Sequence, residues 1–139
     1  MAQLARFGVS MDVELLAAFD RLIAERGYGN RSEAIRDVVR DHIVQAEWES
    51  DDQPTVAALC IVYDHHSRDL PRRLAAIQHR HTGQITASLH VHLDEDNCLE
   101  VIILHGVPSE LRQIADRITT ARGVKHGRLV MTSSGRHLR

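Results

Sequence analysis

Apolar and polar residues alternate near the start of the chain, in the segment ARFGVS. Phe7 and Val9 share one face of this segment, and Arg6, Gly8 and Ser10 share the other, which predicts one short strand. A lone strand is not stable, because its backbone hydrogen bonds need a partner. We therefore expect two copies of the chain to pair these strands into a two-stranded ribbon and form an obligate dimer.

The pattern then changes to apolar residues spaced by three and four, which predicts two amphipathic helices. Asp12 is the expected N-cap of the first helix, and Gly27 is its expected end. Asn30 with Glu33 resembles a capping box and begins the second helix. We assign this strand and these helices to an N-terminal domain of residues 1–48.

A second pattern follows the acidic segment 47–54, which loses periodicity, ends at a proline and is the expected domain boundary. In residues 54–133 the expected elements are a strand at 55–63, a helix at 69–81, strands at 85–93 and 98–104, a helix at 109–121 and a strand at 124–132. This βαββαβ order is that of a ferredoxin-like α+β unit, in which both helices cover one face of a four-stranded sheet.

Two histidines share one face of the strand at 85–93. His90 and His92 project from one side, because side chains alternate along a strand. Leu89, Val91 and Leu93 project from the other side, which we expect the helices to cover. The two imidazoles should then lie on the uncovered face, or in an interface built on it.

The turn after His92 decides where Cys98 lies. A loop of residues 93–97 sets Cys98 opposite His92 and Glu100 opposite His90, whereas a four-residue loop pairs Cys98 with Leu93 among aliphatic side chains. The sequence leaves both registers open.

Imidazole and thiolate together suit a late first-row metal such as Zn, Cu or Ni, and thiolate excludes Mg and Ca. The two cysteines in the sequence do not make a disulfide framework. A fourth ligand must come from outside the hairpin, and His79 and His81 are the nearest candidates by residue type. We expect such a ligand to come from another subunit. His65 and His66 are interpreted mainly as surface residues, and Cys60 as a packing residue.

Composition narrows the class of protein. A chain of 139 residues with 43% hydrophobic and 26% charged residues is typical of a soluble protein, and we expect a cytoplasmic one without a membrane segment. The net charge of −2 gives no overall attraction to nucleic acid. Binding to DNA therefore needs a local patch, for which the candidates are Arg6, Gly8 and Ser10 on the strand and Asn30, Arg31 and Ser32 at the start of the second helix.

The chain resembles the NikR family of nickel-responsive ribbon-helix-helix repressors over nearly its whole length. The segments that carry the resemblance are the short strand, RGYGNRSEAIRD, IQH ending at His79, SLHVHLDEDNCLE and RGVKHG. The resemblance implies an N-terminal ribbon-helix-helix DNA-binding domain and a C-terminal ferredoxin-like (ACT-like) regulatory domain. It also implies a homotetramer, built as a dimer of dimers, that binds double-stranded operator DNA and one Ni²⁺ per subunit.

Carried over by position, the implied nickel ligands are His90, His92 and Cys98 of one subunit and His79 of a neighbour, in a square-planar arrangement. Glu33 and Asp37 match residues that bind a second cation. Arg68 is added to the residues expected to contact DNA. Two departures from the family pattern concern DNA: Gly8 stands where a polar side chain faces DNA, and Ser67 precedes Arg68 where a basic pair is expected.

Together these patterns and the resemblance predict a nickel-dependent transcriptional repressor of nickel-uptake genes, in which bound metal raises the affinity for operator DNA. Two alternatives stay open: a metal-storage or delivery protein, and a regulator of the same architecture that senses copper, zinc or a small molecule. An enzyme is not expected, because no pair of nucleophile and base stands out in the sequence.

Overall fold

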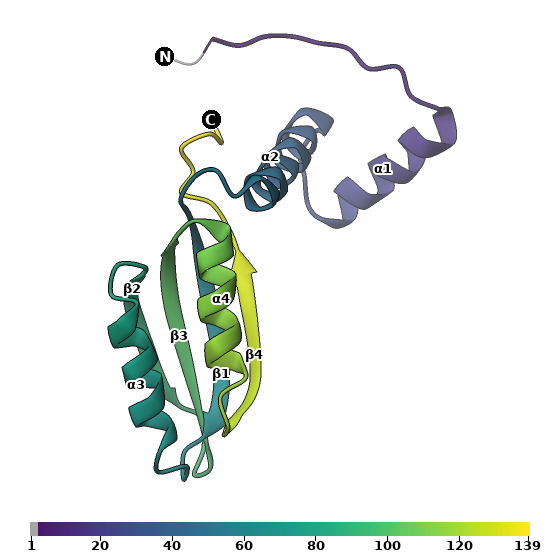
Figure 1. Ribbon diagram of the computed structural model, residues 1–139. Coiled ribbons are helices and arrows are strands. Elements are labelled where there is room, and N and C mark those ends of the chain that lie inside the picture. Colours follow the sequence, from purple (N-terminus) through teal and green to yellow (C-terminus); the bar gives the residue numbers. More distant parts are fainter. Residues whose placement is uncertain (1–2) are drawn as a thin grey trace. The chain divides into compact units, whose positions relative to one another are not determined.

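The computed structural model describes residues 3–139 (Figure 1), which divide into two compact units. The first unit runs up to Ile43 and also contains Gly135–Arg139, and the second is Val44–Ser134. Within the described part of the chain, no helix is both long and apolar enough to cross a membrane.

The first unit contains helix α1 (Val13–Glu25) and the start of helix α2 (Arg31–Ser50). Both predicted helix starts are confirmed. The Asp12 carboxylate accepts hydrogen bonds from the backbone N–H groups of the first turn of α1, and the Asn30 side chain accepts one from the N–H of Glu33 at 2.9 Å. Gly27 has a φ of +83°, the left-handed conformation that ends a helix and favours glycine.

The expected strand around Phe7 is not formed within the single chain. Residues 3–12 carry no strand assignment, and the side chains of Phe7 and Val9 are 74% and 66% exposed. The physical reason is that a strand is defined by hydrogen bonds to a second strand, which one copy of this segment does not contain. The alternation of residues survives as exposed apolar surface.

Helix α2 continues through the first part of the predicted boundary segment, up to Ser50. Trp48 is 2% exposed and belongs to the core of the second unit, where its indole N–H donates to the carbonyl of Thr132 at 2.8 Å. Burial of this indole explains why the helix continues where hydrophobic periodicity is weak.

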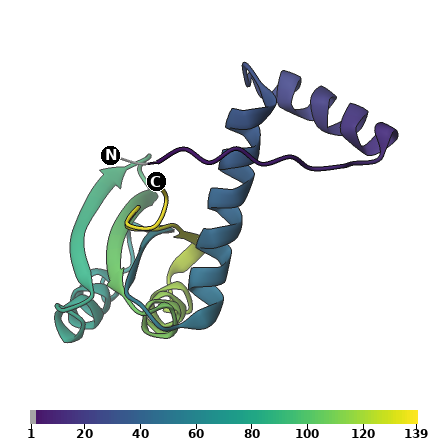
Figure 2. The same ribbon diagram turned by 90° about the horizontal axis from the view of Figure 1, so that it is seen from above.

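The second unit has the predicted βαββαβ order. Its elements are β1 (Thr55–Asp64), α3 (Leu70–Arg80), β2 (Ile85–His92), β3 (Asn97–Gly106), α4 (Pro108–Thr119) and β4 (Val124–Met131). The strands form one sheet in the order β2-β3-β1-β4, and each neighbouring pair is antiparallel. Seen from above in Figure 2, α3 and α4 cover the same face of this sheet.

The core lies between that face and the two helices. Alternate residues of β1 and β3 are buried there, as are the inward stripes of both helices. The largest fully buried side chains include Leu59, Ile61, Leu70, Leu74, Ile102, Leu104, Leu111, Ile114 and Ile118.

One prediction about this sheet is wrong. His90 and His92 lie on the face that α3 covers, because they share a pocket lining with Leu74 and Gln78 of that helix. Leu89, by contrast, is 62% exposed on the opposite face. We expected the reverse from the polarity of β2 alone. That inference fails because the sheet face left open by the helices is itself apolar.

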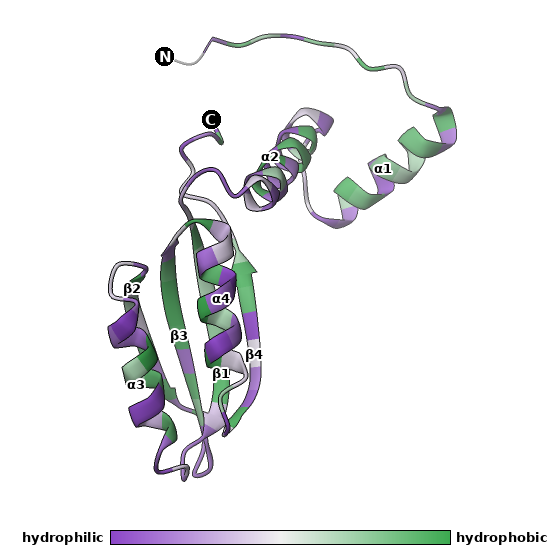
Figure 3. Ribbon diagram, viewed as in Figure 1, coloured by the Kyte–Doolittle hydropathy of each residue, from purple (hydrophilic) through white to green (hydrophobic). Residues whose placement is uncertain are grey.

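We call this the open face. By the strand register it carries the apolar residues Ala58, Cys60, Val62, Leu89, Val91, Leu99, Val101, Ile103 and Val130, together with His105, His126 and Arg128. The green strands in Figure 3 show how hydrophobic the sheet is. An apolar face of this kind, which no helix of its own unit covers, is typical of a protein interface.

Candidate metal centre

The β2–β3 hairpin adopts the register that brings the thiol to the histidines. Cys98 pairs with His92, and Glu100 pairs with His90. The register that would have paired Cys98 with Leu93 is therefore excluded. Because paired residues of antiparallel strands project from the same face, the imidazoles and the thiol share one side of the hairpin.

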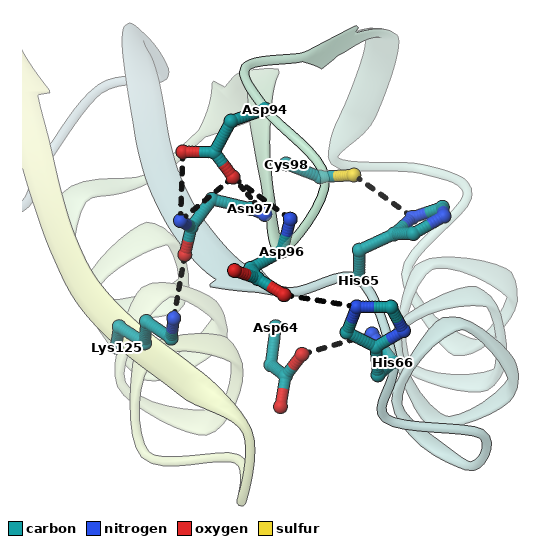
Figure 4. Close-up of polar contacts among 8 residues, drawn as sticks. All are labelled: Asp64, His65, His66, Asp94, Asp96, Asn97, Cys98 and Lys125. Carbon is teal, nitrogen blue, oxygen red and sulfur yellow. Dashed lines mark hydrogen bonds and ion pairs between the residues drawn. The ribbon is translucent and has the colours of Figure 1, made fainter.

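Asp94 determines the conformation of the turn. Its carboxylate accepts hydrogen bonds from the backbone N–H groups of Asp96 at 2.8 Å and Asn97 at 2.7 Å, and from the Asn97 side-chain amide. The side-chain amide of Asn97 is the main cause of a lowered pKa of Asp94, and these backbone N–H groups add to it. Lys125 of β4 donates to Asn97 in turn (Figure 4). The turn is thus held by a charged acceptor, and its register follows from this bonding.

Three metal-binding side chains meet at the end of the sheet beside this turn. Their possible ligand atoms, from His65, His92 and Cys98, all lie within 4.8 Å of one another. The Cys98 Sγ is 3.3 Å from Nδ1 of His65 and 3.5 Å from Nδ1 of His92. Cys98 is fully buried, whereas both histidines are exposed. One soft and two borderline donors in this arrangement can hold a late first-row metal ion.

His65 is the functional candidate that our sequence interpretation undervalued. It follows β1, and its backbone N–H donates to the carbonyl of Asp96 in the hairpin turn at 2.7 Å. Figure 4 shows its ring directed at Cys98. A signal for this was available: in the predicted topology β1 and β3 are antiparallel neighbours, so the end of β1 must lie beside the start of β3.

His90 stands next to this group with a different partner. Its Nδ1 is 2.9 Å from the hydroxyl of Tyr63, and its ring centroid is 5.0 Å from that of His92. Burial raises the pKa of Tyr63 to about 12, with the carboxylate of Glu100 adding to the effect. The phenol therefore remains protonated at neutral pH. It orients the His90 ring and leaves Nε2 as the nitrogen without this contact.

Helix α3 contacts the hairpin through Gln78, not through His79. The Gln78 side-chain amide donates to Glu100 at 3.0 Å. Successive residues of a helix are rotated by about 100°. His79 is accordingly exposed and does not belong to the group of three donors within residues 3–139. His81 ends the helix, and its Nε2 lies 3.3 Å from the Arg117 guanidinium.

The predicted DNA-binding residues of the first unit are exposed. Arg6, Gly8 and Ser10 lie on the segment that precedes α1. At the start of α2, the guanidinium of Arg31 forms two hydrogen bonds of 2.8 Å with the carboxylate of Asp20. The hydrogen bonds from this guanidinium lower the pKa of Asp20. The Arg31 side chain is thus held against α1.

Other predicted ligands already have partners. Asn30 caps α2 through its side chain, which leaves the backbone of Ser32 as a candidate for contact with a phosphate. Asp37, predicted to bind a second cation, accepts hydrogen bonds from the Tyr28 hydroxyl at 2.8 Å and from Arg40 at 2.9 Å. Glu33 lies one turn before it and is exposed.

Arg68 is exposed in the segment between β1 and α3, next to Ser67. The Ser67 backbone N–H donates to the carbonyl of Asp64 at 3.3 Å. The segment therefore turns tightly away from β1, and it connects the end of the sheet that carries the candidate metal ligands to α3.

Two family models match the chain. Residues 56–132 match the model described as the NikR C terminal nickel binding domain, and residues 5–46 match that of the ribbon-helix-helix proteins of the copG family. Together these matches cover both units.

Curated relatives are similar over almost the full length. Proteins named as nickel-responsive regulators from Geotalea uraniireducens and Geobacter sulfurreducens are 50% and 51% identical over 138 residues, which is 99% of this chain and 99% of each relative. A similarly named protein of Thermococcus onnurineus is 50% identical over 136 residues, 98% of this chain and 99% of its own.

Among solved structures, an uncharacterized protein from Thermotoga maritima matches with a TM-score of 0.51 and 14% identity. The match covers 56% of this chain and 96% of that one. At this identity the likeness concerns the fold alone.

Proposed function

Because the chain belongs to the family of nickel-responsive regulators, with a ribbon-helix-helix domain and a nickel-binding domain, we propose that it is a nickel-dependent repressor of nickel-uptake genes. In this proposal it acts in the cytoplasm, where nickel bound between subunits raises its affinity for operator DNA. The observation that carries it is the shared face of His90, His92 and Cys98 in a chain whose DNA-binding domain is a separate unit.

The chemistry of the donors fits nickel. Two imidazoles and a thiolate are ligands for Ni²⁺, and such a set excludes Mg²⁺ and Ca²⁺. Cys98 lies at 3.5 Å from His92, and His90 retains Nε2 for a metal while Tyr63 holds its Nδ1. The sulfur of Cys98 binds a metal ion as a thiolate, so the affinity for nickel depends on pH.

We assign the fourth nickel ligand to His79 of a neighbouring subunit. Its ring is exposed, and the contact between Gln78 and Glu100 directs His79 away from the donors of its own chain. An exposed imidazole on α3 is therefore free to serve a second copy. This support differs from our sequence argument, which relied on the wrong face of the sheet.

A homotetramer follows from two apolar surfaces that one chain leaves uncovered. The first is the open face of the regulatory sheet, where Leu89 is 62% exposed. The second lies on the N-terminal unit, where Leu4, Phe7, Val9, Val13 and Leu15 are each at least 60% exposed. Surfaces this apolar are normally buried in an interface. Pairing of the N-terminal segments buries one surface, and association of regulatory sheets buries the other, which produces a dimer of dimers.

Pairing of the N-terminal segments also determines which side chains can contact DNA. In a two-stranded ribbon, Phe7 and Val9 face the helices, and Arg6, Gly8 and Ser10 face outward, where a ribbon can enter the major groove. Arg31 and Ser32 at the start of α2 would then approach a phosphate, with Asn30 holding that helix end. Arg68 of the regulatory unit is exposed and is a further candidate for contact with DNA.

Nickel can raise the affinity for DNA only if the protein has two domain arrangements and binds nickel more tightly in one of them. Glu33 and Asp37 are assigned to a second cation bound in the DNA complex. There the cation must displace the Tyr28 and Arg40 contacts of Asp37. One Ni²⁺ per subunit is the expected stoichiometry.

The test is operator binding with and without Ni²⁺ at one fixed salt concentration, since salt alone changes DNA affinity strongly. An operator is first selected from random duplexes with the nickel-loaded full-length protein. We expect tight binding with nickel and weak binding without it. Equal affinities would defeat the proposal, and failure to select any duplex would favour a metal-storage or delivery protein.

A further inference from the structure

The structure brings a different set of ligands together from the one proposed for nickel. His65, His92 and Cys98 lie within one chain, with their donor atoms within 4.8 Å of one another. We propose that these three residues form a second, intrachain metal site for an ion that accepts tetrahedral geometry, such as Zn²⁺. This site shares His92 and Cys98 with the proposed nickel site, so one subunit cannot hold both ions at once. In this respect the inference rests on the proposed function.

The distances suit a tetrahedral ion. With metal–sulfur and metal–nitrogen bonds of about 2.3 and 2.0–2.1 Å, a tetrahedral angle separates the sulfur and nitrogen atoms by about 3.6 Å. Cys98 Sγ lies 3.3 Å from Nδ1 of His65 and 3.5 Å from Nδ1 of His92. Both separations come within a few tenths of an ångström of this value. The two imidazole nitrogens lie within 4.8 Å of each other and must approach to about 3.3 Å, which rotation of the exposed rings of His65 and His92 can supply.

His65 is held in this position by its backbone. Its N–H donates to the carbonyl of Asp96 at 2.7 Å, and the next residue, His66, donates its N–H to the Asp64 carboxylate at 2.8 Å. The His66 ring also forms an ion pair with Asp96 at 3.0 Å when protonated. These contacts join the segment after β1 to the hairpin turn (Figure 4). They limit the conformational entropy that His65 loses on binding a metal.

Exposure determines how the coordination is completed. Cys98 is buried, and His65 and His92 are exposed, so a bound ion has its fourth position toward solvent and takes a water molecule there. Zn²⁺ has no geometric preference from d electrons and is satisfied by three protein ligands and water. The square-planar geometry diagnostic of Ni²⁺ needs four donors in one plane, which His90 and a neighbour's His79 complete.

A regulatory consequence follows from the shared ligands. An ion held by His65 uses no residue of another subunit, so it cannot stabilise one arrangement of the tetramer over another as a bridging ion does. The protein loaded at this site therefore keeps the operator affinity of the metal-free form. His65 would thus divert tetrahedral ions away from the regulatory response.

The experiment compares three variants of the full-length protein: His65→Ala, His79→Ala, and His137→Ala as a control that removes another exposed imidazole. Zn²⁺ affinity is measured by competition with a chromophoric chelator, and Ni²⁺ affinity is measured in the same way. Co²⁺ replaces Zn²⁺ to report geometry, because tetrahedral Co²⁺ has intense visible bands and thiolate ligation adds a charge-transfer band. Thermal unfolding of each metal-free variant verifies that the exposed substitutions preserve the fold.

We expect His65→Ala to weaken Zn²⁺ binding by at least about tenfold and to abolish the tetrahedral Co²⁺ bands. Loss of a residue that only orients a ligand already costs about tenfold or more, so loss of a ligand should cost at least as much. Ni²⁺ affinity should be retained in His65→Ala and lost in His79→Ala, and His137→Ala should match the wild type for both metals. Unchanged Zn²⁺ affinity and Co²⁺ bands in His65→Ala would overturn this inference and leave the proposed function standing. Retention of Ni²⁺ affinity in His79→Ala would instead contradict the proposed nickel ligand set.

Discussion

The hydroxyl of Tyr63 lies 2.9 Å from Nδ1 of His90, across two strand pairings of the regulatory sheet. Tyr63→Phe keeps the buried ring and removes only this contact. We expect nickel affinity to fall by about 10- to 100-fold, because partners that orient a ligand contribute that much. A nickel titration measures the change. Tyr28→Phe, which removes a hydroxyl bonded to Asp37 in the other unit, is the control and should leave nickel affinity unaltered.

The two cysteines of the chain allow a paired test of the thiolate. Nickel bound to Cys98 should give a sulfur-to-metal charge-transfer band that disappears in Cys98→Ala and persists in Cys60→Ala. Cys98 is fully buried, so its replacement also costs on the order of 1 kcal/mol in unfolding free energy. Absorption spectra of both nickel-loaded variants show which cysteine supplies the thiolate. A band that survives in Cys98→Ala would remove this residue from the site.

Ligation across subunits can be tested by mixing two defective chains. His79→Ala and Cys98→Ala should each lack high-affinity nickel binding. After joint unfolding and refolding, mixed tetramers should regain part of it, because an intact hairpin of one chain meets an intact His79 of the other. Nickel titration of the mixture against each variant alone provides the measurement. No recovery in verified mixed oligomers would mean that all four ligands come from one chain.

Arg6 should act on DNA and not on the metal. If Arg6 contacts a base edge, Arg6→Ala should weaken operator binding by about 1–3 kcal/mol and leave nickel affinity unchanged. Binding isotherms at fixed salt with nickel-loaded protein measure this loss. Arg72→Ala, an exposed arginine on α3, serves as the control. Equal losses in both variants would point to general electrostatics and not to a specific contact.

The turn of the metal-binding hairpin should be sensitive to acid. Hydrogen bonds from Asn97 and neighbouring N–H groups hold the pKa of Asp94 below its usual value. The resulting stabilisation is present above the unfolded-state pKa of about 3.9 and is lost as pH falls through the lower folded-state value. Asp94→Asn should therefore flatten the decrease of melting temperature of the metal-free protein below about pH 4. A decrease as steep as in the wild type would exclude Asp94 as its source.

Much of this architecture could be predicted from the sequence because it depends on local rules. Helix starts at Asp12 and Asn30 follow from side chains that accept the first free N–H groups, and the end at Gly27 follows from its left-handed backbone. The order of strands and helices followed from the period of the apolar residues. Thiol and imidazole donors in one hairpin were also visible, with two registers left open.

Only the tertiary structure decided which face of the sheet the helices cover, and which histidines meet. Alternation along β2 separates His90 from Leu89, but it cannot say which side is covered when the open face also carries many apolar side chains. His65 reaches Cys98 because β1 and β3 pair over a long sequence distance; the predicted strand order brings these ends together, but no local pattern shows the contact itself. The sequence by itself determined the helices and strands of the second unit and the types of donor. The sheet pairing determined which donors come together.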